Sequence, residues 1–278
     1  MSGEHAVKLL CETLVVSRSG YYDWLAGKES LHAQEDRSLG EQIQKAYAQS
    51  RATYGSPRIT AALRSQGCPV GRRRVARLMR AAGLRGRQKR RYRVVTTDSA
   101  HDEPIARNLL AQRPAPKRPD EVWLTDITYI QTDEGWLYLA GVLDRCTRRL
   151  IGWSMDTQLD ASLAVAALEM AVRQRRPSPG VIHHSDRGIQ YASAEYRDRL
   201  AVHGMTPSMS RAGNCYDNGA MEAFWSTIKN EMVYRRRFLT RAQARTAVFD
   251  YIEGFYNRTR LHSALGFKSP LDYETTLT

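Results

Sequence analysis

Three acidic residues occupy positions where a carboxylate could carry out chemistry. Asp126 interrupts an apolar segment, Asp186 follows a short apolar run, and Glu222 lies in the first turns of an expected helix. A charge within an apolar segment is costly unless it is paired or binds a metal ion. Carboxylate oxygens suit Mg²⁺, and two such ions about 4 Å apart can stabilise both the attacking and the leaving oxygen of a phosphodiester. The three acids therefore predict metal-dependent cleavage or joining of nucleic acid, without a protein nucleophile.

Each acid also has a purely structural explanation. Asp126 could be a buried hydrogen-bonded group, Asp186 a helix or turn cap, and Glu222 a favourable charge at a helix N-terminus. Two further acids compete for the same roles, because Asp144 ends an expected strand and Asp217 precedes Glu222. Taken one at a time, the acids do not decide between structure and catalysis.

Other side chains near the acids have similar alternatives. His183 and His184 precede Asp186 and could support it or contact phosphate, although His184 is more simply a hydrogen-bonded side chain at a strand end. Trp123 and Trp136 are interpreted as core residues. Trp225, on the same expected helix as Glu222, could pack in the core or stack on a base.

The elements that would position the acids form an alternating pattern. Three apolar runs separated by turns predict a β-meander, and helices and strands then alternate. The expected strands cover residues 122–130, 136–143, 150–155, 181–184 and 206–210, and the expected helices cover residues 161–175, 193–203, 218–234 and 240–257. This order predicts an α/β fold with helices on both faces of the sheet.

The positive charge of the chain is concentrated in one segment. The net charge is +13, and residues 51–93 contain 14 of the 42 Lys and Arg but no Asp or Glu. The remaining 28 basic residues (42 − 14) are balanced by 29 acidic ones. Such an excess points to a polyanionic partner.

Helical patterns within this region predict a small all-α helix-turn-helix. A helix from Leu39 is followed by one that Ser56 caps and Pro57 opens, and a third runs from about residue 72 to 82 and stops at Gly83. The third helix carries five arginines on its expected outer side, namely Arg72, Arg73, Arg74, Arg77 and Arg80. They predict a recognition helix for a DNA major groove, the alternative being a solvated basic face.

The rest of the chain supplies connections. Residues 1–35 contain two short helical patterns that could form either a second helix-turn-helix or a packing arm, and the prolines after residue 95 indicate a linker. Four widely spaced cysteines suggest neither zinc nor disulfides, and no apolar segment approaches the length of a membrane span, so a cytoplasmic, non-membrane protein is expected. The expected domains are an arm (1–35), a helix-turn-helix domain (36–95), a basic linker (96–119), a catalytic core (120–235) and a C-terminal helical extension (236–278).

The spacing of the acids resembles the DD(35)E signature of the transposase and retroviral-integrase superfamily. There are 35 residues between Asp186 and Glu222 and 59 between Asp126 and Asp186, a spacing that Asp144 and Asp217 do not keep. The resemblance implies an RNase H-like catalytic core with a mixed five-stranded sheet. It also implies that Asp126, Asp186 and Glu222 are catalytic metal ligands and that Lys229, two helical turns after Glu222, contacts DNA ends.

Further stretches narrow the resemblance to bacterial insertion-sequence family three, second reading frame. They cover residues 54–59, 75–79, 123–129, 184–191, 217–222 and 256–262. The resemblance implies a transposase that uses two Mg²⁺ ions, with Mn²⁺ expected to substitute. It would bind double-stranded DNA of transposon ends and target as a homo-oligomer, nick the 3′ ends and transfer them, close to the bacterial nucleoid.

Two alternative functions stay open at this point. The chain could be a non-catalytic regulator bound to transposon ends, or half of a fused transposase that needs an upstream-frame helix-turn-helix and leucine-zipper protein, since it shows no sustained heptads. A nuclease of the RNase H class would share the carboxylates. That third function does not explain the basic helix-turn-helix.

Overall fold

A computed structural model describes residues 6–27, 29–87, 103–111, 113–211 and 218–277. The chain divides into two compact units, Met1–Gly86 and Arg87–Thr278. The first unit is all-helical, with α1 (Val7–Thr13), α2 (Arg18–Leu25), α3 (Leu31–Gln49), α4 (Ser56–Ser65) and α5 (Arg72–Ala81). None of the described helices is long and apolar enough to cross a membrane.

The predicted helix-turn-helix is confirmed in α3–α5. The inward side chains Ile43, Ile59, Leu63 and Val75 are buried together at the spacing that one helical face requires. Two local predictions were wrong. α3 begins at Leu31 rather than Leu39, because the Ser30 side chain accepts a hydrogen bond from the Ala33 amide and caps an earlier start.

The second local error concerns the start of α4. Gly55 occupies the N-cap position and Ser56 is already helical, with no side-chain hydrogen bond to cap the helix. A glycine can take the extended N-cap conformation without cost, and a close approach also favours it here. A Cβ on the neighbouring Gly86 would lie 2.6 Å from the Gly55 Cα. The packing of two backbones at this point, which spacing alone does not reveal, therefore sets the helix boundary.

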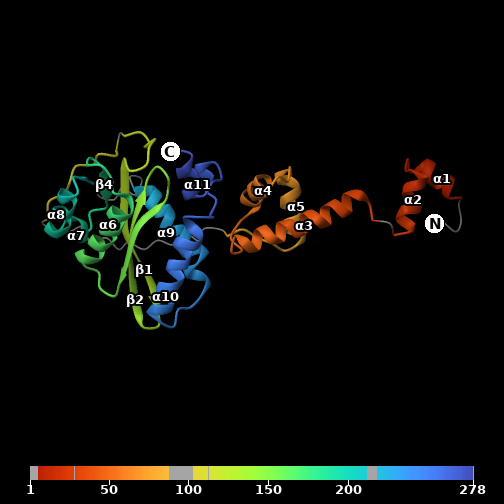
Figure 1. Ribbon diagram of the computed structural model, residues 1–278. Coiled ribbons are helices and arrows are strands. Elements are labelled where there is room, and N and C mark those ends of the chain that lie inside the picture. Colours follow the sequence, from red (N-terminus) through yellow and green to blue (C-terminus); the bar gives the residue numbers. More distant parts are fainter. Residues whose placement is uncertain (1–5, 28, 88–102, 112, 212–217, 278) are drawn as a thin grey trace. The chain divides into compact units, whose positions relative to one another are not determined.

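The second unit contains the predicted mixed five-stranded sheet (Figure 1). The strands are β1 (Val122–Thr132), β2 (Gly135–Asp144), β3 (Leu150–Asp156), β4 (Ile182–Ser185) and β5 (Thr206–Met209), in the order β3-β2-β1-β4-β5. β1 to β3 pair antiparallel, and β4 and β5 join parallel to β1. The α/β, RNase H-like fold class is confirmed.

Helices cover both faces of this sheet (Figure 1). They are α6 (Ala161–Arg175), α7 (Ile189–Ala192), α8 (Ala194–Val202), α9 (Gly219–Glu231), α10 (Arg241–Phe249) and α11 (Pro270–Thr275). α6 to α8 enclose an apolar cluster that includes Trp123, Val142 and Leu168. α9 and α10 lie on the opposite face, so the sheet is buried from both sides.

Glycines permit the closest helix approaches to the sheet. A Cβ on Gly152 would lie 2.3 Å from the Ala167 carbonyl oxygen of α6, and one on Gly141 would lie 2.8 Å from the Met221 Cε of α9. Such distances leave no room for a side chain. α6 and α9 can therefore pack on the two faces only because these strand positions are glycine.

The C-terminal residues pack on the core of the second unit. The expected helix over 240–257 changes to a π-helix over Asp250–Tyr256, which turns the Asn257 side chain toward β3. Its amide donates to the Leu150 carbonyl at 2.9 Å and accepts from the Leu150 amide at 3.0 Å. Arg260 forms a buried ion pair with Glu231 at the end of α9, 2.7 Å between nitrogen and oxygen. The ion pair fixes the end of α9, the helix that carries Glu222.

Candidate active site

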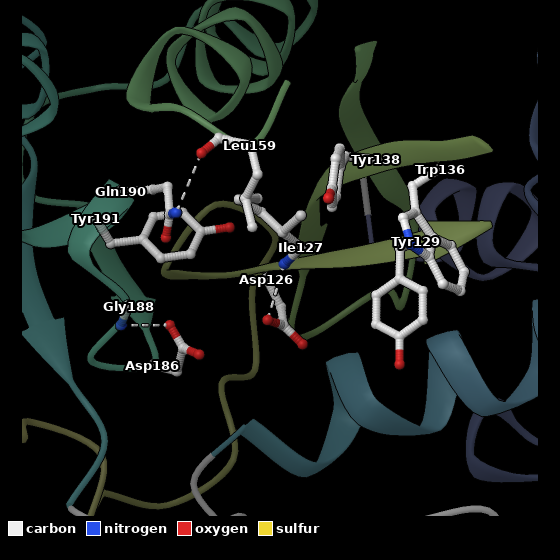
Figure 2. Close-up of a pocket in the computed structure, with 10 residues that line it drawn as sticks. All are labelled: Asp126, Ile127, Tyr129, Trp136, Tyr138, Leu159, Asp186, Gly188, Gln190 and Tyr191. Atoms are coloured by element: carbon white, nitrogen blue, oxygen red, sulfur yellow. Dashed lines mark hydrogen bonds between the residues drawn. The ribbon is translucent and has the colours of Figure 1, made fainter. Parts of the chain in front are cut away.

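The register of the central strands brings Asp126 and Asp186 to one place. Leu124 of β1 lies beside His184 of the parallel strand β4, and each aspartate follows two residues later along its own direction. Alternate residues share a face of a strand. Both carboxylates therefore point to the same face, Asp126 from the middle of β1 and Asp186 from the residue after the carboxyl end of β4. They line one pocket of about 340 Å³ (Figure 2).

The surroundings of Asp126 disfavour its charged form. Burial and the neighbouring charge of Asp186 raise the pKa of Asp126 to about 8, against 3.8 for a free aspartate, and Glu222 adds to the rise. Two hydrogen bonds oppose it, from the Ile127 amide at 2.8 Å and from the Trp225 indole at 3.0 Å. Like charges held together in a partly dry pocket favour either a shared proton or a bound cation.

Asp186 sits at a tight turn after β4. Its carboxylate accepts from the Gly188 amide at 2.9 Å (Figure 2), and a Cβ at Gly188 would lie 3.0 Å from the same oxygen. The turn leads directly into α7. Asp186 therefore caps this turn, while α7 itself has no side-chain cap, and the same carboxylate also lines the pocket.

Glu222 lies in the first turn of α9, the helix that packs on the face of the sheet to which Asp126 points. Two contacts tie α9 to β1: the Trp225 indole bonds to Asp126, and the Asn218 amide donates to the Thr125 carbonyl at 3.2 Å. Partial removal of water raises the pKa of Glu222. Glu222 does not line the 340 Å³ pocket, and over the residues that the structure describes no three acid, histidine or cysteine side chains stand close enough to hold one ion. The structure thus brings Asp126 and Asp186 together and leaves Glu222 near them, within reach of Asp126 electrostatically.

Lys229 lies one helical turn beyond Trp225 on α9. Its Nζ is 4.8 Å from the centroid of the Tyr129 ring, a cation–π contact. Burial lowers the pKa of Lys229, and the charge of Asp126 opposes this shift. The ammonium therefore stands near the carboxylates, although its role in DNA contact stays a prediction.

The competing residues have mainly structural partners. Asp144 is fully buried and accepts hydrogen bonds from the Thr147 amide and hydroxyl, which hold the turn after β2, and from the Asp120 amide, which joins that turn to the segment before β1. Asp217 and Cys215 lie outside the described residues. His184 is bonded to the Ser208 and Ser210 hydroxyls at 2.9 and 3.0 Å, which supports its interpretation as a hydrogen-bonded strand residue.

His183 and two of the three tryptophans considered above are buried, whereas Trp136 is exposed. Burial lowers the pKa of His183 to about 3, so the ring is neutral beside the Tyr196 hydroxyl. Trp123 is buried as expected and Trp225 packs in the core, where it also bonds to Asp126. The prediction that Trp136 is a core residue was wrong, because its side chain is 44% exposed. It lies at the start of β2, where its ring lines the pocket that also holds Asp126 and Asp186.

The five arginines of α5 differ in their surroundings. Arg74 donates to Asp36 at 2.7 Å and to Glu35 at 3.0 Å, and Arg77 also pairs with Asp36. The acids belong to α3, outside the acid-free segment. Arg72, Arg73 and Arg80 are exposed, and no ion pair of theirs is found within the described part of the chain. The basic helix face is present, with two of its members engaged inside the unit.

Family comparisons match both units. Residues 33–92 match an HTH-like domain, and residues 116–215 and 203–270 each match an Integrase core domain. The fold and the paired carboxylates thus define a DDE-type polynucleotidyl transferase preceded by a helix-turn-helix.

Whole-chain relatives specify the family. A Shigella sonnei "Insertion element IS600 uncharacterized 31 kDa protein" is 47% identical over 261 residues, which cover 94% of this chain and 96% of that protein. "Transposase InsF for insertion sequence IS3A" of Escherichia coli K12 is 41% identical over 273 residues, 98% and 94% of the two chains. The chain belongs to the IS3 family of insertion-sequence transposases. A simian T-cell lymphotropic virus intasome structure aligns over 84% of this chain and 74% of its own, with 14% identity and a TM-score of 0.49.

Proposed function

We propose that this chain is the catalytic transposase of its insertion sequence, which nicks the 3′ ends of the element and transfers them to target DNA at one site. The observation that carries the proposal is the pair Asp126 and Asp186 in a single pocket. The charge of Asp186 contributes to the raised pKa of Asp126. A pair of carboxylates that repel each other in this way favours a cation between them.

The metal we propose is Mg²⁺, as two ions for which Mn²⁺ substitutes. The donor set fits, because carboxylate oxygens are hard ligands and the pocket is open to solvent and phosphate. When bound, the metal would stabilise charge on the attacking and leaving oxygens of the phosphodiester. We assign Asp126, Asp186 and Glu222 as its ligands, with a closer position of Glu222 in the DNA complex than in the free chain.

The surrounding residues hold these ligands. Trp225 donates to Asp126 and sits one turn after Glu222, so the same helix orients one ligand and carries another. Lys229 provides a positive charge on that helix for the DNA end. The pair of Arg260 and Glu231 anchors the other end of α9 to the C-terminal residues.

The first unit is proposed to recognise the ends of the element. Arg73 and Arg80 are exposed on α5 and, with Arg72 and Arg77, provide donors for phosphates and guanine edges in a major groove. We propose that a homo-oligomer assembles on the two DNA ends. Residues 1–35 and 96–119 would then act as an arm and a linker around the helix-turn-helix domain, and residues 236–278 as a brace of the catalytic core.

The decisive experiment incubates the full chain with labelled duplex DNA of the element's end and Mg²⁺, and scores nicking and strand joining. Asp126→Asn and Asp186→Asn should abolish both products while end binding is retained. Asp144→Asn is the matched control, because that buried carboxylate is hydrogen-bonded to Thr147 and Asp120 and does not line the pocket. Full nicking by Asp126→Asn would disprove the proposal. Binding without cleavage by the unaltered chain, with cleavage restored by an upstream-frame protein, would instead identify it as half of a two-part transposase.

A further inference from the structure

The carboxylate pocket has far more apolar wall than metal ions or phosphate oxygens require. Six of its ten lining residues are aromatic or aliphatic: Ile127, Tyr129, Trp136, Tyr138, Leu159 and Tyr191. Figure 2 shows Gln190 and Tyr191 beside Asp186, and Tyr138 and Trp136 beyond Asp126. A flat, apolar group could enter between these walls. The amide of Gln190 would meet its polar edge.

Trp136 is the most exposed part of this wall and is held in place. Its ring packs edge-on against Tyr129, with the centroids 4.8 Å apart, and its carbonyl accepts from the Arg241 guanidinium at 3.2 Å. Tyr138 follows two residues later on the same face of β2. An aromatic surface that is both open and fixed can bind a planar ring with little loss of side-chain entropy.

A second pocket lies against the same two rings. It has a volume of about 510 Å³ and is lined by Tyr129 and Trp136 together with the basic residues Lys229, Arg236 and Arg237. Arg237 bonds to Asp133 at 2.9 Å, whereas Arg236 is exposed beside the Phe238 ring. The Tyr129–Trp136 wall therefore separates an acidic, aromatic pocket from a basic one. This arrangement matches a nucleotide, whose base is flat and whose phosphate is negative.

We propose that Trp136 stacks on one unpaired nucleobase of the DNA strand beside the phosphodiester that is cut, with an adjoining phosphate in the pocket of Lys229 and Arg236. The inference rests on the proposed function and names the form of its substrate: a DNA end whose terminal base has left the helix. Unpairing costs energy, which stacking on an aromatic side chain offsets. The basic pocket favours a nucleotide over an apolar protein segment as the occupant.

The test uses the full chain and end DNA that carries 2-aminopurine in place of the base next to the cleavage position, without divalent metal so that no cutting occurs. Stacking in the duplex already quenches 2-aminopurine, so a base that leaves the helix should stay quenched in the complex only because it stacks on tryptophan. Trp136→Ala should remove the quenching and weaken binding about tenfold, whereas Trp136→Phe should retain part of both. The control is Trp24→Ala, since Trp24 is also exposed but lies in the first unit.

A second arm measures nicking of matched DNA with an abasic residue at that position. Trp136→Ala should slow nicking of intact DNA and have no further effect on abasic DNA. Equal quenching by the unaltered chain and by Trp136→Ala would overturn the base pocket. Normal nicking without Trp136-dependent quenching would refute only this inference. Quenching without nicking in Mg²⁺ would support the base pocket and refute the proposed function.

Discussion

Asp126 and Asp144 are both carboxylates surrounded by protein, and their different environments separate a reactive group from a structural one. Asp144 receives hydrogen bonds from the amide and hydroxyl of Thr147 in the turn after β2 and from the amide of Asp120 before β1. Asp126 receives two hydrogen bonds but faces a second carboxylate across an open pocket. Its charge is thus under-compensated in the free protein. Perturbed carboxylates in a cleft mark functional sites, and the pKa of this one is raised by burial and by the carboxylate with which it would bind metal.

The raised pKa of Asp126 predicts a pH-dependent stability. Between 3.8, its value in the unfolded chain, and about 8, the folded protein holds a proton that the unfolded chain has lost. In metal-free buffer the free energy of unfolding should therefore fall as the pH rises through this window. Mg²⁺ should raise the melting temperature more at about pH 8 than at about pH 6, because binding must displace that proton.

Thermal melts of the full chain at several pH values, with Mg²⁺ or EDTA, provide the measurement. Asp126→Asn removes the titrating charge, so its stability in EDTA should fall less with pH and its response to Mg²⁺ should be small. Asp156→Asn is a control for loss of one surface carboxylate. If the melting temperatures of the unaltered chain and of Asp126→Asn changed in parallel with pH, titration of Asp126 would be excluded as the cause of the pH-dependent stability.

At the scale of elements, the sequence predicts the strands of the sheet and the proximity of Asp126 and Asp186. It does not predict where two backbones pack against each other. Alternating apolar runs indicate β1 to β5, and the pairing of the first residues of β1 with β4 brings Asp126 and Asp186 near each other. The exposure of Trp136 was missed because an aromatic residue in a strand has the same pattern whether or not a helix covers it. The acids of α3 that pair with Arg74 were missed because they lie outside the basic segment.

The position of α9 depends on such a backbone contact. Gly141 lies opposite Asp126 in the β1–β2 ladder, and a Cβ there would meet Met221 and Trp225, the neighbours of Glu222 in the helix. Gly141→Ala should therefore push α9 outward, destabilise the fold by about 1–3 kcal/mol, and reduce nicking by about 100-fold through misplacement of Glu222.

Thermal melts and single-turnover nicking measure the two effects of Gly141→Ala. Gly40→Ala is the control, because the space around Gly40 in α3 is open and alanine favours a helix. That variant should retain full nicking activity. Unchanged nicking by Gly141→Ala would mean that Glu222 is not positioned by the packing of α9 on β2.

At the scale of the whole molecule, the excess positive charge and the paired carboxylates belong to different parts of the chain. The basic residues of 51–93 lie in the helix-turn-helix unit and the segment after it, whereas the paired carboxylates lie in the second unit. A polyanion bound by the first unit would neutralise the exposed arginines of α5. Arg74, already paired with Asp36 and Glu35, would contribute to the stability of the unit instead.

This division predicts different salt dependences for neighbouring arginines. Arg73→Ala and Arg80→Ala should each weaken binding to end DNA and reduce the slope of log affinity against log salt by about 1, because each exposed guanidinium releases counterions from a phosphate. Arg74→Ala should lower the melting temperature and leave the slope unchanged. Fluorescence anisotropy over a range of salt concentrations measures the slopes, with Asp126→Asn as the binding-competent reference. Should Arg74→Ala reduce the slope as much as Arg73→Ala does, Arg74 must leave its pair with Asp36 to reach DNA, and α5 would bind through its whole basic face.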